Sequence, residues 1–202
     1  MTEKNYLTTL NTRPFLYAET KIVATFLHQG KKHEEILKQI MRENLFQLNS
    51  SDRTMRFFSE ILKRLDELDV FLFNQLLFSD EQTSKAILFY AILKKDQLLY
   101  EWMREVVWEK FLVLDWYLNK EETKAFFKRK AEDNQTIANW TTETKQLLMD
   151  AYHRLLEEVD MAVIDGEELQ LQRPAIDYDL RRYLIERKEK EIVEVILGEL
   201  MD

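Results

Sequence analysis

The chain has 202 residues, of which three are glycine, two are proline and none is cysteine. Glycine and proline make up about 12% of average proteins, so this chain cannot supply the many tight turns of a sandwich, barrel or propeller. The absence of cysteine excludes a disulfide framework, a thiolate nucleophile and a cysteine-based metal site. Because 46% of the residues are hydrophobic and 33% are charged, the composition predicts a folded, all-α protein.

Charge is unevenly distributed along the chain, whose formal net charge is −8. Residues 157–202 contain fourteen acidic and six basic residues, and the rest of the chain is neutral. Within that neutral part, residues 31–64 contain eight basic and five acidic residues. The overall charge argues against a surface that binds nucleic acid everywhere, but it leaves room for a basic patch near the N-terminus.

No segment has the pattern of a signal peptide or a membrane span. The most apolar stretch, 86–93, has eight residues, whereas a helix needs about 20 to cross a bilayer. We therefore expect a cytoplasmic protein without a membrane partner.

The first third of the chain predicts four helices after an irregular start. Apolar residues recur at helical spacing over 19–29, 32–44, 51–68 and 70–78. Ser50 or Ser51 is placed to cap the third helix. We expect this helix to bury Met55, Phe58, Ile61, Leu62 and Leu65 and to project Arg53, Arg56, Lys63 and Arg64 elsewhere.

The middle of the chain predicts two helices, over 79–95 and 96–118, that are apolar around much of their circumference. Such helices belong at the centre of a fold. The second carries three tryptophans, which could form a base-stacking platform. Their helical spacing in an apolar region favours core packing instead.

The last third predicts helices and the one plausible pair of strands. A helix begins at Asn119, and a short helix at 134–139 precedes a long one at 142–159. Asp165-Gly166 is typical of a type I′ turn, so we expect at most one short β-hairpin, within about 161–172. Two short helices, near 177–187 and 188–200, close the chain.

Two lobes follow from this order of elements. The first, 1–118, contains a candidate helix-turn-helix (32–68) and the central apolar helices. The second, 119–202, contains a winged-helix-like segment and the acidic tail. We expect a compact two-lobed helical protein.

The helix pair 32–44 and 51–68 is the first candidate nucleic-acid motif. A capped helix with basic residues in its first turns can contact DNA, and Arg53 and Arg56 occupy those turns. Lys31 and Lys32 could bind the sugar-phosphate backbone of the DNA. A helical hairpin with a solvated basic face is the alternative, since the connector exceeds the usual three or four residues.

The segment 134–172 is the second candidate motif, with helices followed by a wing. Thr142, Lys145 and Arg154 could face a phosphate backbone. A purely structural hairpin is the alternative, and the acidic pair Glu167-Glu168 at the wing tip favours it, because phosphates repel carboxylates.

Catalytic signatures are sparse. The three glycines stand alone, so no phosphate-binding loop is present. His153 and Glu157 share a helix face at i, i+4, and a surface ion pair explains this spacing better than a metal site does. We predict no enzyme activity, no cofactor and no metal.

Several segments together resemble the BrxA family of the BREX (bacteriophage exclusion) phage-defence systems. The resemblance begins at Tyr17-Ala-Glu-Thr-Lys-Ile-Val-Ala and Gly30, and continues through Leu45-Phe-Gln and Ser51-Asp-Arg-Thr-Met-Arg. It extends over about residues 12–200 and includes 86–95, 98–111 and the closing Arg173-Pro174.

The resemblance implies an all-helical protein with helix-turn-helix-like elements and a fold compared with the RNA-binding protein NusB. It implies binding to double-stranded DNA without known catalysis, with other BREX proteins as further candidate partners. A protein-interaction adaptor and a NusB-like RNA binder are the alternatives. The residues expected to contact nucleic acid are Arg53, Arg56, Lys63, Arg64, Lys31, Lys32, Thr142 and Lys145.

Overall fold

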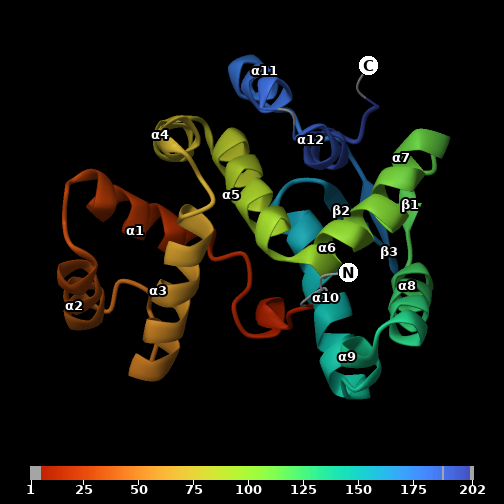
Figure 1. Ribbon diagram of the computed structural model, residues 1–202, viewed down its shortest axis with the longest axis horizontal. Coiled ribbons are helices and arrows are strands. Elements are labelled where there is room, and N and C mark those ends of the chain that lie inside the picture. Colours follow the sequence, from red (N-terminus) through yellow and green to blue (C-terminus); the bar gives the residue numbers. More distant parts are fainter. Residues whose placement is uncertain (1–5, 188, 201–202) are drawn as a thin grey trace.

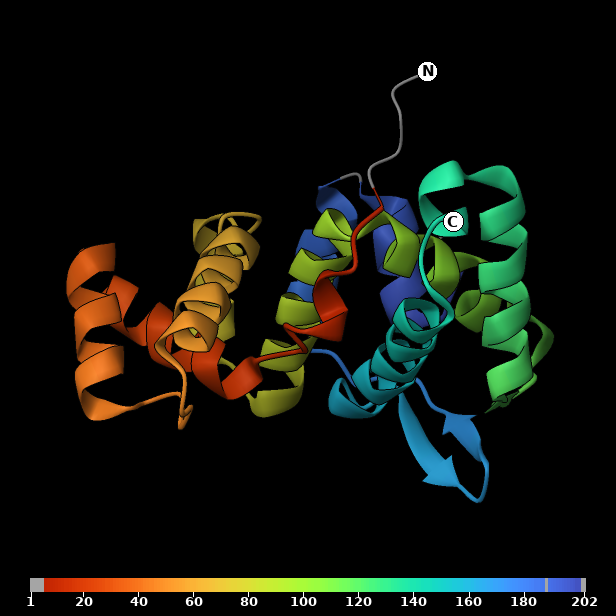
Figure 2. The same cartoon turned by 90° about the horizontal axis from the view of Figure 1, so that it is seen from below.

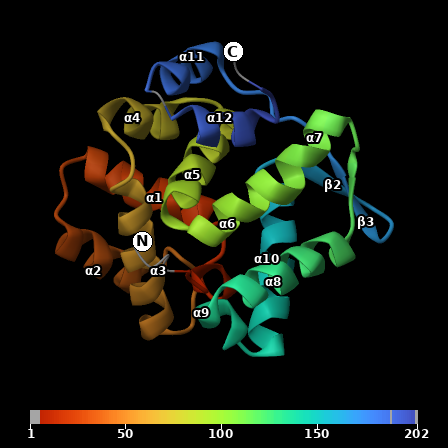
Figure 3. The same cartoon turned by 45° about the vertical axis from the view of Figure 1, so that its right-hand side comes forward.

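A buried helix, α5 (Glu81–Lys95), lies at the centre of the protein. The computed structural model describes residues 6–187 and 189–200. Every residue of α5 from Ala86 to Leu93 is buried, which confirms the predicted central position. Figures 1 and 3 show α5 in the middle of the molecule, and α4 (Val70–Phe78) and α12 (Lys190–Leu197) pack against it.

The second central helix is interrupted by a π-helical segment. α6 (Gln97–Trp102), η2 (Met103–Trp108) and α7 (Glu109–Val113) follow one another without a break. The run ends at Val113, where Leu114 adopts a left-handed conformation, so the helix expected to reach residue 118 is shorter. Trp102 and Trp108 are buried, as the core-packing interpretation predicts.

The N-terminal end of the molecule contains η1 (Thr9–Asn11), α1 (Tyr17–His28), α2 (His33–Glu43) and α3 (Ser51–Leu65). Ser50 caps α3 by accepting a hydrogen bond from the Arg53 amide, as predicted. The inward face of α3 agrees with the prediction at Phe58, Ile61 and Leu65, which are buried. It differs at Met55, which is 42% exposed, and at Arg64, which is 1% exposed. A charged residue therefore occupies an interior position beside the predicted apolar face.

The C-terminal helices begin at polar caps in the expected places. α8 (Lys120–Asp133) has a capping box formed by Asn119 and Glu122. Thr141 caps α10 (Thr142–Glu158), and Asp177 caps α11 (Tyr178–Glu186). The short α9 (Gln135–Ala138) lies between α8 and α10. The predicted helix 142–159 therefore agrees with α10 almost to the residue.

The predicted hairpin is present and gains a third strand. β2 (Ala162–Asp165) and β3 (Glu168–Leu171) pair antiparallel, and the two-residue strand β1 (Tyr117–Leu118) joins the other edge of β3. The loop consists of Gly166 and Glu167, and only the glycine has positive φ (63°). This is the pattern of a type II′ turn, so the expected type I′ turn is wrong. Figure 2 shows the hairpin projecting from the body.

Two sets of contacts cross the boundary proposed at residue 118. β1 pairs with β3, and α12 packs on α5 and η2. The division into lobes 1–118 and 119–202 stays a prediction. Among the residues that the structure describes, no helix is both long and apolar enough to cross a bilayer.

Candidate nucleic-acid interface

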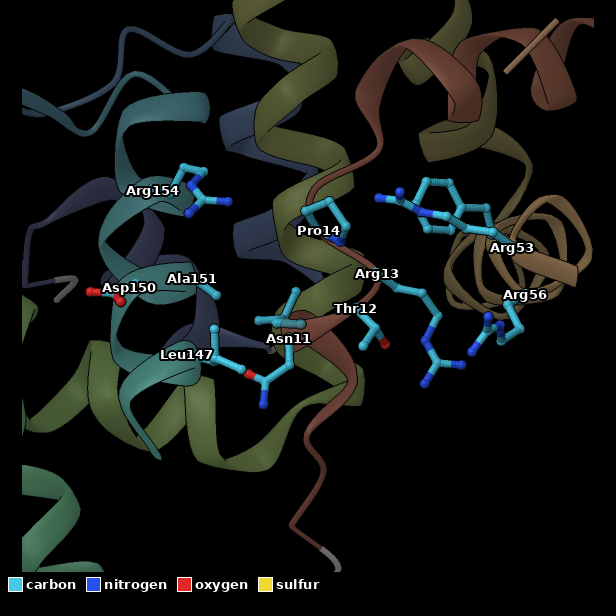
Figure 4. A pocket seen from close by; sticks show the side chains of 12 residues that line it. Asn11, Thr12, Arg13, Pro14, Arg53, Arg56, Leu147, Asp150, Ala151 and Arg154 are labelled. Atoms are coloured by element: carbon cyan, nitrogen blue, oxygen red, sulfur yellow. The ribbon is translucent and has the colours of Figure 1, made fainter. Parts of the chain in front are cut away.

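A cavity of about 390 Å³ opens between the N-terminal end of α3, the segment before α1, and α10. Residues 10–14 form its floor, and α3 and α10 form opposite walls (Figure 4). Leu10, Pro14, Phe57, Leu147 and Ala151 supply its apolar surface. The cavity is thus assembled from three segments that are far apart in the sequence.

Four arginines line this cavity, and together we call them the arginine cluster: Arg13, Arg53, Arg56 and Arg154. Asp150 is the only acidic residue among the lining side chains. Within the described residues, none of the four guanidinium groups forms an ion pair with a carboxylate. The cavity therefore concentrates positive charge that no ion pair among the described residues neutralises.

Local contacts hold two members of the cluster near the cap of α3. The Arg53 guanidinium lies 5.1 Å from the centre of the Phe57 ring, within the range of a cation–π contact. Arg56 Nε donates to the Asp52 carbonyl at 3.3 Å. Because the first amides of a helix carry partial positive charge, the end of α3 adds to the attraction for an anion.

Arg64 has a structural role, so its predicted contact with phosphate is wrong. Its Nη1 donates to the carbonyls of Pro14 (2.8 Å) and Phe15 (2.7 Å), and its Nη2 donates to that of Arg13 (2.9 Å). Its Nε donates to Glu60 at 3.1 Å. Arg64 thereby fixes the segment that forms the floor of the cavity and positions Arg13.

Glu60 is the buried counterion of Arg64. Burial acts to raise the pKa of this carboxyl, but the hydrogen bond from Lys95 and the charge of Arg64 outweigh it and lower the pKa. The Lys95 ammonium lies 2.7 Å from the carboxylate. Glu60 is therefore ionised at neutral pH and compensates the charge of the buried guanidinium.

The structure separates the other predicted site residues from the cavity. Lys63 is exposed on α3, ten residues and thus about 15 Å along the helix from Arg53. Lys31 and Lys32 lie in the connection between α1 and α2, and Thr142 and Lys145 lie in the first turns of α10. None of these five lines the cavity. Of the eight predicted contacts, only Arg53 and Arg56 line this cavity.

Two members of the arginine cluster were not expected there. Arg13 precedes the first helix, and no pattern links it to residues 53–56. Arg154 is expected to face a phosphate backbone as part of the separate winged motif 134–172, and not together with residues 53–56. Its spacing from Leu147, Asp150 and Ala151 on α10 marks a common helix face, but the sequence alone does not show that this face meets α3.

His153 is buried, so the predicted surface ion pair with Glu157 is wrong. Its Nε2 lies 2.7 Å from the Thr123 hydroxyl, which also accepts a hydrogen bond from Trp102 Nε1 at 3.2 Å. Burial lowers the pKa of His153 to about 4, so the ring is neutral at pH 7. No group of three or more His, Cys, Asp or Glu in the described part of the chain is arranged to hold a metal ion.

The fold and the arginine cluster define a class: a helical protein with a small sheet and an arginine-lined cavity. A sequence profile of the BrxA family matches residues 4–188. The "BREX protein BrxA" of Bacillus cereus (strain H3081.97) is 30% identical over 197 residues, which cover 98% of both chains. The chain therefore belongs to the BrxA family.

Two further similarities cover the same extent. The "BREX protein BrxA" of Paramagnetospirillum magneticum (strain ATCC 700264 / AMB-1) is 22% identical over 97% of this chain and 98% of its own. The crystal structure of an uncharacterized protein from Magnetospirillum magneticum has a TM-score of 0.81 at 21% identity. It covers 97% of this chain and 100% of its own, which shows that the two share a fold along their full length.

Proposed function

We propose that this protein is a non-catalytic accessory protein of a BREX phage-defence system that binds the backbone of double-stranded DNA. The observation that carries the proposal is the arginine cluster, in which four arginines from three segments line one cavity and form no ion pair with a carboxylate of the described residues. Guanidinium groups form bidentate hydrogen bonds with phosphate. Membership of the BrxA family supports the defence context.

The chemistry of the cluster favours binding over catalysis. Arginine stays protonated in proteins, so it neutralises charge but does not transfer protons. A protein that holds the backbone in this way gains affinity from counterion release and reads little sequence. The helix pair α2–α3 places Arg53 and Arg56 at the start of the second helix, as a helix-turn-helix does.

The test is fluorescence anisotropy of a labelled DNA duplex over a salt series. If the cluster neutralises about four phosphates, log K should fall with log salt at a slope near −4. Arg53→Ala combined with Arg56→Ala should weaken binding at least tenfold and reduce the slope to about −2. Arg182→Ala, an exposed arginine on α11, is the matched control and should leave the affinity unchanged.

Arg154→Ala separates the cavity from a simple helix-turn-helix. Arg154 lies on the wall opposite α3 (Figure 4), so its loss should weaken DNA binding if the backbone enters the cavity. An unchanged affinity would restrict the contact to α3. No duplex binding at about 50 mM salt, or tighter binding to a matched RNA hairpin, would contradict the proposal.

A further inference from the structure

A second cavity adjoins the first along α10, beneath the projecting hairpin. It is a cleft of about 1150 Å³ between the hairpin, the start of α8 and the C-terminal half of α10. Its apolar part comes from Ile164 and Leu169 of the hairpin. Ile164 is 67% exposed, so the described elements leave the distal end of this sheet face uncovered. The cleft is thus an open site with an unpartnered apolar residue at its wall.

The charge of this cleft is opposite to that of the arginine cluster. Its acidic lining residues outnumber its two basic ones, Lys120 and Arg154. Glu157, Glu167 and Glu168 form no ion pair within the described residues. The acidic lining residues are Glu121, Asp150, Glu157, Glu167 and Glu168. A nucleic-acid backbone is repelled here, whereas a cationic ligand is attracted.

The hairpin also offers an unpaired strand edge. In the order β1-β3-β2, strand β2 has a strand partner on one side only in the described part of the chain. The Leu171 amide donates to the Trp116 carbonyl at 2.7 Å, so Leu171 and Leu169 direct their backbone groups toward β1. Ile164 is paired with Leu169, so its N–H and C=O point to the free edge of β2. These groups can bond to an added strand.

We propose that this cleft and strand edge bind an extended, lysine- and arginine-rich segment of another protein. The free backbone groups of Ile164 select an extended chain, and Ile164 itself offers one apolar contact. The unpaired carboxylates select basic side chains over acidic ones. Pairing of β2 with the β2 of a second copy would bring an acidic hairpin, and not a basic segment, to this acidic cleft, so charge disfavours that occupant.

The proposal does not depend on DNA binding. Arg154 and Asp150 of α10 line both cavities, so the cationic site and the anionic site adjoin along this stripe of the helix. Because the two sites differ in charge, they attract different ligands. A protein of a defence system would then bind nucleic acid and a partner protein at neighbouring sites along α10.

Synthetic peptides test the proposal with the full chain. The probe is a labelled twelve-residue peptide in which lysine or arginine alternates with valine, and its binding is measured by anisotropy. One comparison peptide has glutamate in place of the basic residues, and another has proline in place of the valines. Only the basic, uninterrupted peptide should bind, and raising the salt concentration should weaken it.

Two pairs of variants locate the site. Glu167→Lys with Glu168→Lys should weaken peptide binding at least tenfold and leave DNA binding no weaker. Glu132→Lys with Asp133→Lys, at the exposed far end of α8, makes the same charge change and should have little effect. Ile164→Pro removes the outward N–H at an edge position that tolerates proline, and should abolish binding in a folded protein, whereas Ile164→Val should bind as before.

Three results would overturn the proposal. The first is equal weakening by the charge changes on the hairpin and on α8. The second is equal binding of the basic peptide and its proline-containing version, which would exclude strand addition. The third is self-association of the unmodified protein that Ile164→Pro abolishes in sedimentation experiments, because a second copy would then occupy the edge.

Discussion

Arg64 and Lys63 are neighbours on α3 with opposite surroundings. Arg64 is 1% exposed and donates to three backbone carbonyls, whereas Lys63 is exposed. A buried guanidinium is stable only when its donors are satisfied. The position of each residue, and not its charge, therefore decides which one supports the fold.

Arg64→Met should destabilise the protein by about 3 kcal/mol, because it leaves buried carbonyls without donors. Lys63→Met should change the free energy of unfolding by less than about 0.5 kcal/mol. Denaturant unfolding followed by circular dichroism measures both. Similar midpoints for the two variants would show that the Arg64 hydrogen bonds contribute little to stability.

Which individual side chains of α3 are buried was hard to predict from the sequence. The periodicity of 51–68 placed Met55 inside and Arg64 outside, since a hydrophobicity pattern ranks residues by side chain alone. The three carbonyls that accept from Arg64 belong to residues about fifty positions earlier. No local pattern contains such a long-range partner, so the burial of a charge was not predictable.

At the scale of elements, glycines end helices where the backbone turns left-handed. Gly30 (φ 77°), after α1, has open space around the position of a Cβ atom. Gly198 (φ 64°), after α12, would place a Cβ 2.8 Å from the Phe111 ring. A residue with a Cβ atom would strain the backbone at both positions, but only at position 198 would the Cβ atom also clash with the core.

Gly30→Ala should therefore cost about 1–2 kcal/mol through its backbone conformation. Gly198→Ala should cost more, because the Phe111 ring must move in a packed core. Thermal unfolding of the two variants compares them directly. An equal loss would mean that the Phe111 ring adapts without cost.

Elements were predictable from the sequence because their signals are local. Asp69, Asn119 and Thr141 cap helices as polar residues of these types do. The end of the helix at Val113 was missed, because it depends on Leu114 adopting a left-handed conformation, which leucine rarely does. Strand β1 was missed for a similar reason, since two residues carry no alternation.

At the scale of the whole molecule, the pKa values of two buried groups are shifted in opposite directions, so the two groups change stability oppositely as the pH rises. Burial raises the pKa of Asp96 to about 6 and lowers that of His153 to about 4. Between pH 4 and 6 the folded state binds more protons than the unfolded state at Asp96, so this group makes stability fall as the pH rises. At His153 the unfolded state binds more protons, so stability rises with pH up to about 6.5.

Single variants should reveal these two opposing contributions to the free energy of unfolding, each of about 3 kcal/mol. Relative to the unmodified protein, Asp96→Asn should make stability increase more steeply between pH 4 and 6. His153→Gln should make it increase less steeply or decrease. Urea unfolding at several pH values gives both slopes. Changes of the same sign in the two variants would contradict the assignment.

The candidate site was the least predictable feature at this scale. Arg53 and Arg56 could be selected from their place in the first turns of a capped helix. Arg13 and Arg154 joined them only through the packing of η1 on α10. The relation between two distant helices and the segment before α1 is a property of the assembled core, and a single sequence does not encode it in any readable spacing.

The segment 10–14, which forms the floor of the cavity lined by the arginine cluster, also has a consequence for biosynthesis. Asn11 Nδ2 donates to the Thr144 carbonyl at 3.3 Å, across 133 positions of the chain. During translation, residues 10–14 leave the ribosome long before α10 exists, so the cavity cannot close until most of the chain has been made. If the cavity holds phosphate as we propose, a nascent chain without α10 has no second wall for the anion. Anion binding would then begin only after α10 has been made.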